Sequence, residues 1–273
     1  MSIFKGKTAI VTGGASGIGE AVCLRLGACG ANVIVADIRA GKAESVAEQI
    51  RQTGGRAESR NLDVTDKDSV YRLVEETARE HGGLDYMFNN AGVHVIGEVR
   101  DMSLEQWEKV ININAMGPLY GTLAAFSVMT LQGRGHIVNT ASLAGITYLP
   151  LTVAYNMTKH AVSGLSLSLR AEAAGLGVAV SVVYPGVVKT PLYDTSPCVG
   201  ANMKELMGRL TLFECTPDKA AEHILKGVAK NKALILFPLH SHVLWLLFRA
   251  FPRAMIKLGE APMWFFRKKI RKV

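Results

Sequence analysis

The chain has 273 residues, of which 49% are hydrophobic and 20% charged, a mix typical of a globular protein and not of a disordered one. No run of 18 apolar residues occurs and the N-terminus lacks a signal-type apolar segment, so we expect a cytoplasmic protein. The formal net charge of +8 is uneven, because residues 240–273 hold eight Lys/Arg and one Glu, or +7, which leaves +1 for the other 239 residues.

Strand-like and helix-like segments alternate from the start of the chain to residue 238. Short runs rich in apolar residues predict seven strands, in the segments 7–13, 31–37, 57–64, 84–92, 133–142, 177–186 and 232–238. Apolar residues that recur at helical spacing predict helices in the segments 17–28, 43–53, 66–81, 101–111, 152–174 and 217–228.

This alternation predicts an α/β fold built from strand–helix–strand units. Right-handed crossovers give a doubly wound, mostly parallel, seven-stranded sheet with helices on both faces, a Rossmann-like three-layer sandwich. We expect one domain over residues 1–239 and a basic, aromatic extension over 240–273. In such sheets ligands bind beyond the carboxyl ends of the strands, so the polar residues there are the candidates for a functional site.

The first strand is followed by the glycine-rich turn "TGGASGIG", which leads into a helix. Gly13, Gly17 and Gly19 allow a tight turn and a close approach of a pyrophosphate to the backbone, with Ser16 and Ile18 between them. The spacing is neither the Gly-x-Gly-x-x-Gly of the common dinucleotide motif nor a P-loop. A plain structural turn is the alternative.

Asp37 ends the second predicted strand, eighteen residues after Gly19. A carboxylate there can accept both ribose hydroxyls of NAD and would repel the 2′-phosphate of NADP. Arg39 lies close enough to weaken this preference. Asp63 and Val64 end the third predicted strand, where Asp63 could meet the adenine amino group.

The motifs together resemble those of the short-chain dehydrogenase/reductase family over residues 5–238. "TGGASGIG" is similar to the family's glycine turn and "NNAG", which includes Asn90, to its central-strand motif. Ser142, Tyr155 and Lys159 reproduce its Ser-x12-Tyr-x3-Lys spacing, and Asn114 fits its helix asparagine. "YPGVVKTP" resembles its Pro-Gly-x-Val-x-Thr segment, although Tyr184 stands where Asn or Cys is common.

The resemblance implies hydride transfer between a nicotinamide cofactor and a carbonyl or alcohol. Tyr155 would exchange a proton with the substrate oxygen. A free tyrosine titrates near pH ~10, and a cation one helical turn away, Lys159, favours the phenolate. Ser142 would hold the substrate oxygen, and Asn114 would position a water that links Lys159 to solvent.

We expect NAD(H) to be favoured over NADP(H). The residues expected to bind it are Gly13, Ser16, Gly17, Ile18, Gly19, Asp37, Asp63, Val64, Asn90, Tyr155, Lys159, Pro185, Val188 and Thr190.

A substrate lid is expected near residues 191–215, where four apolar residues share a helical face. They are Met203, Leu206, Met207 and Leu210. Met-rich surfaces adapt to irregular apolar ligands, and His94, Leu143 and Leu149 are expected near the same pocket. A hydrophobic secondary alcohol or its ketone is therefore the expected substrate. The alternative is that the lid packs on the core or on another subunit.

The extension at 240–273 mixes Trp and Phe with its basic residues. It is too interrupted to span a bilayer, but contact with anionic lipid is one interpretation. A contact between subunits and a solvated basic end are the others, and no nucleic-acid-reading module is present. The resemblance suggests a homotetramer or homodimer.

The histidines and cysteines show no metal-binding pattern. The cysteines are Cys23, Cys29, Cys198 and Cys215, and none forms Cys-x-x-Cys. His240 and His242 are close but have no acidic or cysteine neighbour, so no metal site is expected. Two other functions stay open: an NADPH-dependent 3-oxoacyl-type reductase, and a nucleotide-binding, membrane-associated scaffold without turnover.

Overall fold

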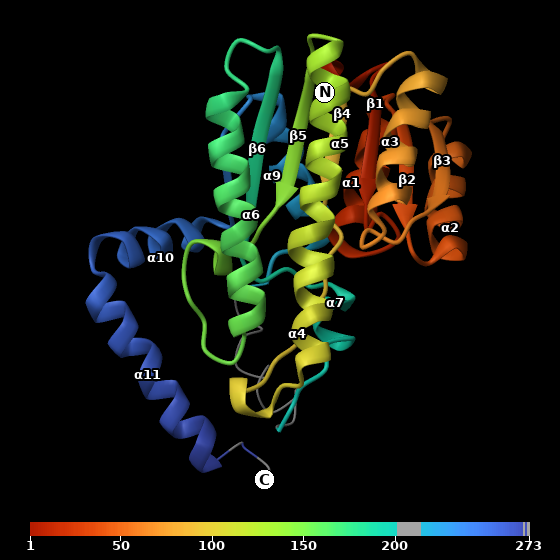
Figure 1. Cartoon of the computed structure of the whole chain (residues 1–273). Coiled ribbons are helices and arrows are strands. Elements are labelled where there is room, and N and C mark those ends of the chain that lie inside the picture. The colour runs from red at the N-terminus through yellow and green to blue at the C-terminus, as the bar shows by residue number, and fades with distance from the viewer. Residues whose placement is uncertain (201–213, 270, 272–273) are drawn as a thin grey trace.

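Seven parallel strands form one sheet at the centre of the computed structural model, which describes residues 1–200, 214–269 and 271 (Figure 1). The strands are β1 (Thr8–Thr12), β2 (Asn32–Asp37), β3 (Arg56–Asn61), β4 (Tyr86–Asn89), β5 (Gly135–Thr140), β6 (Val178–Pro185) and β7 (Leu234–Phe237). Their order is β3-β2-β1-β4-β5-β6-β7, so the strand order reverses between β1 and β4. The predicted fold class is confirmed, and the reversal marks where a ligand crevice forms.

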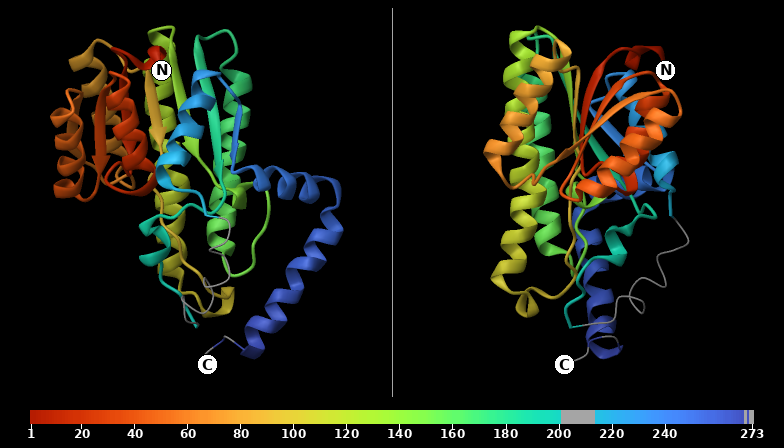
Figure 2. Two further views of the ribbon diagram at one scale, coloured as in Figure 1. Left: turned by 180° about the vertical axis from the view of Figure 1, so that it is seen from behind. Right: turned by 90° about the vertical axis from the view of Figure 1, so that its right-hand side faces the viewer.

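Helices cover both faces of the sheet, as the side view in Figure 2 shows. The helices α1 (Gly17–Ala28), α2 (Ala40–Gln52) and α9 (Pro217–Ala229) pack on one face. The helices α3 (Lys67–His81), α5 (Gly117–Leu131) and α6 (Val153–Glu172) pack on the other. All five residues of β1 are buried, because a central parallel strand has an apolar layer on each side.

The helix α4 (Leu104–Ile111) continues through a π-helical turn, Asn112–Met116, into α5. Ser103 caps α4 in a capping box with Gln106, as the predicted helix start requires. The sequence pattern predicts no helix between Ile111 and the strand at 133–142, so α5 is not anticipated. Gly117 and Pro118 suggest a break, and α5 is apolar nearly all round, so it carries little periodic signal. The π turn matters because it carries Asn114.

Several predicted boundaries differ from the observed ones, and two of the differences have a clear physical cause. The strand β3 ends at Asn61, not at Val64, because Asp37 is the last residue of β2 and pairs with Asn61, which leaves no partner beyond. Asp63 and Val64 therefore lie in the turn that follows. The helix α2 begins at Ala40, not at residue 43, because its exposed first turn shows no apolar periodicity.

Four buried polar side chains join β4, β5, α5 and α6 beneath the carboxyl end of the sheet. Asn89 donates to Asn139 Oδ1 (2.8 Å) and to Thr122 Oγ1 (3.3 Å). Asn139 donates in turn to Ser166 Oγ (3.0 Å), whose hydroxyl donates to the carbonyl of Val162. A buried network with its bonds made fixes how the two helices sit on the strands, and α6 carries Tyr155 and Lys159.

The C-terminal extension folds into two helices, α10 (Leu239–Ala250) and α11 (Pro252–Lys269). They project from the end of β7 and α11 descends toward the α4 end of the molecule (Figures 1 and 2). Among the helices within the described ranges, none combines the length and hydropathy needed to cross a bilayer.

His136 in β5 gives the fold a testable pH dependence. Its Nε2 lies 2.8 Å from Ser181 Oγ, which donates to the carbonyl of Lys232, so the neutral ring donates to Ser181. Burial, and secondarily the charge of Arg170, lowers the pKa of His136 to about 4. Because the unfolded state then binds the proton more tightly than the folded state, stability falls as the pH falls from about 6.5 to about 4.

A His136→Gln variant should therefore lose less stability than the wild type between pH 7 and pH 4. The full difference is about 3 kcal/mol, and urea unfolding at a series of pH values measures it. His242→Gln, at an exposed histidine of α10, is the matched control. Equal slopes for the wild type and His136→Gln would contradict the assignment.

Candidate active site

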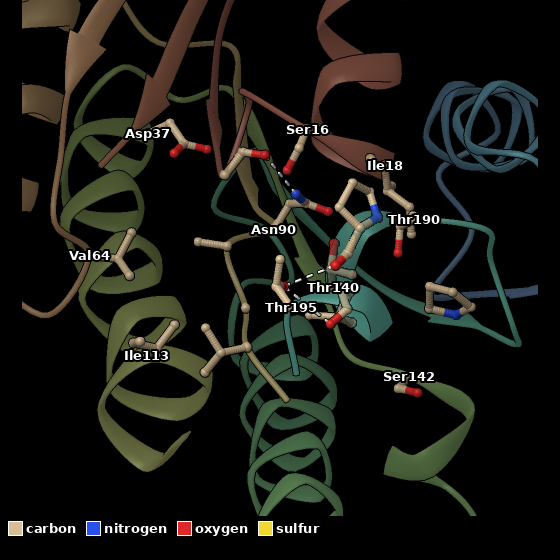
Figure 3. Close-up of a pocket in the computed structure, with 18 of the residues that line it drawn as sticks. Ser16, Ile18, Asp37, Val64, Asn90, Ile113, Thr140, Ser142, Thr190 and Thr195 are labelled. Atoms are coloured by element: carbon tan, nitrogen blue, oxygen red, sulfur yellow. Dashed lines mark hydrogen bonds between the residues drawn. The ribbon is translucent and has the colours of Figure 1, made fainter. Parts of the chain in front are cut away.

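One cavity of about 450 Å³ opens at the carboxyl ends of β1 to β6. Its lining comes from the segments that follow these six strands, which the parallel sheet brings to one edge, and from Ile113 of the π turn and Tyr155 and Lys159 of α6. Figure 3 shows Asp37 and Ser16 at one side, Asn90 near the middle, and Ser142 on the opposite side. The cavity lies at the switch in strand order, where the sequence predicts a ligand site.

The glycine turn packs directly against the segment that follows β4. A Cβ atom at Gly19 would lie 2.1 Å from the carbonyl oxygen of Gly13 and 2.6 Å from Asn90 Nδ2, so no side chain fits there. Gly13 has φ of +64°, which favours glycine. The start of α1 is thereby held against the turn, with Ser16, Gly17 and Ile18 on the cavity wall.

Asn90 ties the end of β4 to the end of β1. Its backbone N–H donates to Thr12 Oγ1 (3.0 Å), and its Nδ2 donates to the Thr12 carbonyl (3.2 Å). The N–H of Ala91 donates to the same hydroxyl (3.2 Å). These bonds fix the two strand ends on either side of the switch.

Asp37 is buried and its carboxylate is held from two sides. Arg39 donates to it through its backbone N–H and Nε, both at 3.0 Å, and the backbone N–H of Ala15 donates at 3.1 Å. Burial alone would raise the pKa of Asp37, but the hydrogen bonds from Arg39 and Ala15 outweigh it and lower the pKa below its ordinary value. Arg39 also reaches Ser16 Oγ (2.8 Å), so a cation and an anion sit together at this end.

Lys159 places a buried amino group at the other end of the cavity. The residue is 3% exposed, and its Nζ donates to the carbonyl of Thr140 at 2.8 Å. Nζ lies 5.5 Å from the centre of the Tyr155 ring, one helical turn away on α6. Burial lowers the pKa of Lys159 to about 8, so at neutral pH the group is still mostly charged.

Ser142 lines the same cavity as this pair, and the short 3₁₀ helix that follows it, η4 (Leu143–Gly145), docks on α6. A Cβ atom at Gly145 would lie 2.6 Å from the Lys159 carbonyl, and Ser163 Oγ donates to the Gly145 carbonyl at 3.1 Å. Ser142 begins η4 and its hydroxyl oxygen accepts from the Ala144 N–H (3.2 Å). The close approach of η4 to α6 sets Ser142 beside the helix that carries Tyr155.

Asn114 is fully buried in the π turn and bonds the backbone of Val93 twice. Its Oδ1 accepts from the Val93 N–H and its Nδ2 donates to the Val93 carbonyl, both at 2.8 Å. A Cβ atom at Gly92 would lie 3.3 Å from Asn114 Oδ1 and 3.7 Å from Lys159 Nζ. The amide oxygen and the amino group therefore border the same small space.

Most other predicted cofactor residues also reach the cavity. Asp63, Val64, Pro185, Val188 and Thr190 line it. The Asp63 carboxylate is bound by its own turn, where Thr65 donates to Oδ1 through its N–H (2.9 Å) and its hydroxyl (2.8 Å). Gly19 lies behind the wall and acts through the packing of the turn.

The residues predicted to contact the substrate do not line the cavity within the described part of the chain. His94, Leu143 and Leu149 are not among the described residues that line the cavity. The His94 ring instead packs edge-on against Tyr155, with 4.5 Å between ring centres, and burial, then the charge of Lys159, lowers the pKa of His94 to about 4. Met203 and Met207, with Leu206 and Leu210, lie outside the described residues.

Several of the lining residues are not among those predicted from the sequence. They are Ile38, Leu62, Val93, Ile113, Thr140, Ala141, Leu192 and Thr195. Each lies within five residues of a predicted site residue, so the available signal was proximity to Asp37, Asp63, Asn90, Asn114, Ser142 and Thr190. Leu192 belongs to a short helix, α7 (Pro191–Asp194), at the start of the expected lid.

The described ends of the expected lid are tied to the domain. Val188 forms a bridge with Cys215 at one end, and Ile96 forms a bridge with Cys198 at the other. The N–H of Ile96 donates to the Pro197 carbonyl (3.0 Å). All four cysteines are free.

Comparisons with known proteins agree with this geometry. A family model described as short chain dehydrogenase matches residues 7–197. An uncharacterized oxidoreductase of Staphylococcus aureus (strain MRSA252) is 35% identical over 195 residues, which are 71% of this chain and 84% of that protein. The cyclohexanol dehydrogenase of Acinetobacter sp. (strain SE19) is 35% identical over 192 residues, 69% of this chain and 76% of that protein.

Solved structures extend the likeness to nearly the whole chain. A short-chain dehydrogenase/reductase from Burkholderia phymatum, in complex with NAD, superposes with a TM-score of 0.84 at 27% identity. The match covers 94% of this chain and 96% of that one. The chain therefore belongs to the short-chain dehydrogenase family, a family of oxidoreductases.

Proposed function

We propose that this protein is an NAD(H)-dependent oxidoreductase that interconverts a hydrophobic secondary alcohol and its ketone. The observation that carries the proposal is the buried amino group of Lys159, held by Thr140 beside the ring of Tyr155. A buried cation next to a phenol is costly for folding and useful for proton transfer.

The residues present fit a dinucleotide. The missing side chains at Gly13 and Gly19 leave a backbone cradle at the start of α1, where N–H groups and the helix dipole favour a pyrophosphate. Asp37, at the end of β2, suits a ribose. The NAD-bound relative from Burkholderia phymatum supports the same cofactor here. When bound, NAD(H) supplies the hydride acceptor or donor.

Tyr155 is the group that exchanges a proton with the substrate oxygen. The pKa of Lys159, lowered by burial to about 8, leaves the ammonium charged at neutral pH, and its charge favours the phenolate form of Tyr155. A phenolate accepts the proton of an alcohol as hydride leaves, and the phenol returns it to the oxygen of a ketone. The edge-on contact with His94 restrains the Tyr155 ring.

Ser142 and Asn114 complete the proposed machinery. The Ser142 hydroxyl would orient the substrate oxygen toward Tyr155 by a hydrogen bond. Asn114 Oδ1, on the same small space as Lys159 Nζ, would hold a solvent molecule that passes the proton onward. Both groups are fixed by backbone hydrogen bonds, so their positions do not depend on the substrate.

An apolar substrate is supported by the cavity wall and by one relative. Val93 and Leu192 are among the apolar residues that line the cavity, and the related Acinetobacter protein is a cyclohexanol dehydrogenase. Burial of apolar carbon against such a wall favours a hydrocarbon carbinol over a polar sugar or acid.

Replacing Tyr155 by Phe should remove turnover and spare cofactor binding. The ring and its contact with His94 remain, while the proton-transferring hydroxyl is lost, so kcat should fall on the order of a thousandfold. Oxidation of cyclohexanol and a panel of hydrophobic alcohols with NAD, followed by the absorbance of the reduced nicotinamide, measures turnover. NADH fluorescence titration measures binding.

Tyr71→Phe is the matched control, because Tyr71 is a half-buried tyrosine on α3. It should behave like the wild type in both assays. If Tyr155→Phe kept wild-type turnover on any alcohol of the panel, the role given to Tyr155 would be wrong.

The cofactor preference should depend on the Asp37–Arg39 pair. Asp37→Asn keeps an acceptor for the Ala15 N–H but removes the charge that repels a 2′-phosphate. The ratio of NADPH to NADH affinity should therefore rise about tenfold or more, equal to ~1.4 kcal/mol. Arg39→Gln should move the ratio the opposite way, because a cation that attracts phosphate is lost.

Paired fluorescence titrations with NADH and NADPH measure both ratios. If Asp37→Asn kept the wild-type ratio of NADPH to NADH affinity, the assignment of NAD(H) on the basis of Asp37 would be wrong. A wild type that binds NADPH more tightly than NADH would favour the 3-oxoacyl-type reductase instead.

A further inference from the structure

The helix α10 carries an apolar stripe that faces away from the domain. The residues of the stripe are Leu239, Val243, Leu246 and Leu247, and they are between 41% and 81% exposed. They fall at helical spacing on one side of α10, whereas Ser241 is buried and Leu244, Trp245 and Phe248 are half-buried. Four large aliphatic side chains in one exposed row mark an interaction surface.

The stripe cannot fold back onto the protein, because the opposite side of α10 is already in contact. Phe248 packs edge-on against Tyr148, with 4.8 Å between ring centres. A Cβ atom at Gly186 would lie 2.7 Å from Ser241 Oγ, so α10 starts against the turn after β6.

The helix α11 is anchored at its far end as well. Glu98 is 6% exposed and receives Arg267 (Nη2–Oε1 2.7 Å) and Arg271 (Nη1–Oε2 3.1 Å). Phe266 is buried in a cluster with Ile96 and Leu151. The extension is therefore packed against the domain at both ends, through α10 and through the contacts of Glu98 and Phe266.

Basic side chains of the extension are exposed beside the stripe and along α11. Arg249, Arg253 and Lys257 are exposed, and no ion pair among the described residues engages them. The aromatic residues on the same helices accompany this charge: Lys268 lies 4.7 Å over the exposed ring of Trp264, and Arg249 lies 5.7 Å over Trp245. Residues 240–273 carry +7 in all, from eight Lys/Arg and one Glu.

We propose that the two-helix extension docks on the anionic surface of a lipid bilayer, with the α10 stripe in the apolar boundary and the basic residues at the headgroups. An exposed aliphatic row flanked by Lys/Arg and Trp is the pattern of helices that lie in a membrane interface. The stripe could be covered by a second copy of this chain or by a lipid surface, and the charge of the extension favours the lipid surface. A second copy would bring a second +7 to the contact, whereas an anionic surface attracts it.

Sedimentation of the full chain with vesicles tests the proposal. The protein should pellet with vesicles of phosphatidylcholine and phosphatidylglycerol, far less with phosphatidylcholine alone, and less as salt is raised. Leu246→Gln/Leu247→Gln should reduce the partition coefficient on the order of tenfold. Arg249→Gln/Arg253→Gln/Lys257→Gln should reduce it by a similar factor.

Two control variants carry the same kinds of substitution outside the extension, so they lose a similar apolar area or the same number of positive charges. Leu104→Gln/Leu131→Gln changes two leucines that are 68% and 88% exposed on α4 and α5. Lys42→Gln/Lys67→Gln/Lys230→Gln removes three exposed lysines outside the extension. Both controls should pellet like the wild type, and thermal melting by circular dichroism should show every variant folded.

Failure of the full chain to pellet with anionic vesicles would overturn the proposal, as would equal binding by the extension variants and their controls. Sedimentation velocity tests the alternative that a second copy of this chain covers the stripe. If Leu246→Gln/Leu247→Gln lowers the oligomeric state and leaves vesicle binding unchanged, the stripe is a contact between copies of this chain and the lipid assignment is wrong.

Discussion

The burial of the Lys159 amino group is the constraint on which the rest of the site depends. An ammonium that is 3% exposed needs an acceptor, and the carbonyl of Thr140 at the end of β5 supplies one at 2.8 Å. That bond requires α6 to lie close over the strand end, which the docking of η4 at Gly145 and the buried polar network beneath it secure. The same burial lowers the pKa of Lys159 to about 8, so one packing arrangement both orients Tyr155 and sets a cation beside it.

Much of this site could be predicted from the sequence because its signals are local. The four-residue spacing of Tyr155 and Lys159 needs only a helix to bring them together. Apolar runs that alternate with amphipathic helices leave few topologies other than a parallel sheet, and a parallel sheet gathers the strand ends at one edge. Asp37 and Asn90 then had to lie near the glycine turn, whatever the details of packing.

The remainder depends on contacts between distant parts of the chain. The sequence near Asp37 does not show that Arg39 folds back onto its carboxylate. Sequence patterns predict helices, strands and turns, but they do not give the rotamer of a side chain. Glu98 and Arg267 are 169 residues apart, so the anchoring of α11 leaves no local pattern. The helix α5 is apolar nearly all round and the π turn at Asn114 has no sequence signature. His94 lies next to Tyr155 but behind the cavity wall, which spacing alone does not distinguish from a position on it.

The most direct measurement is the titration of the protein with NADH, read by the change in nicotinamide fluorescence. The wild type should bind NADH saturably, and Gly19→Ala should weaken binding by about tenfold or more, because a Cβ atom there would lie 2.1 Å from the Gly13 carbonyl and would displace the cradle. Gly41→Ala on α2, where a Cβ atom meets nothing within 4 Å, should bind like the wild type. A folded wild type that binds no NADH, or a Gly19→Ala protein that binds it as tightly as the wild type, would contradict the account.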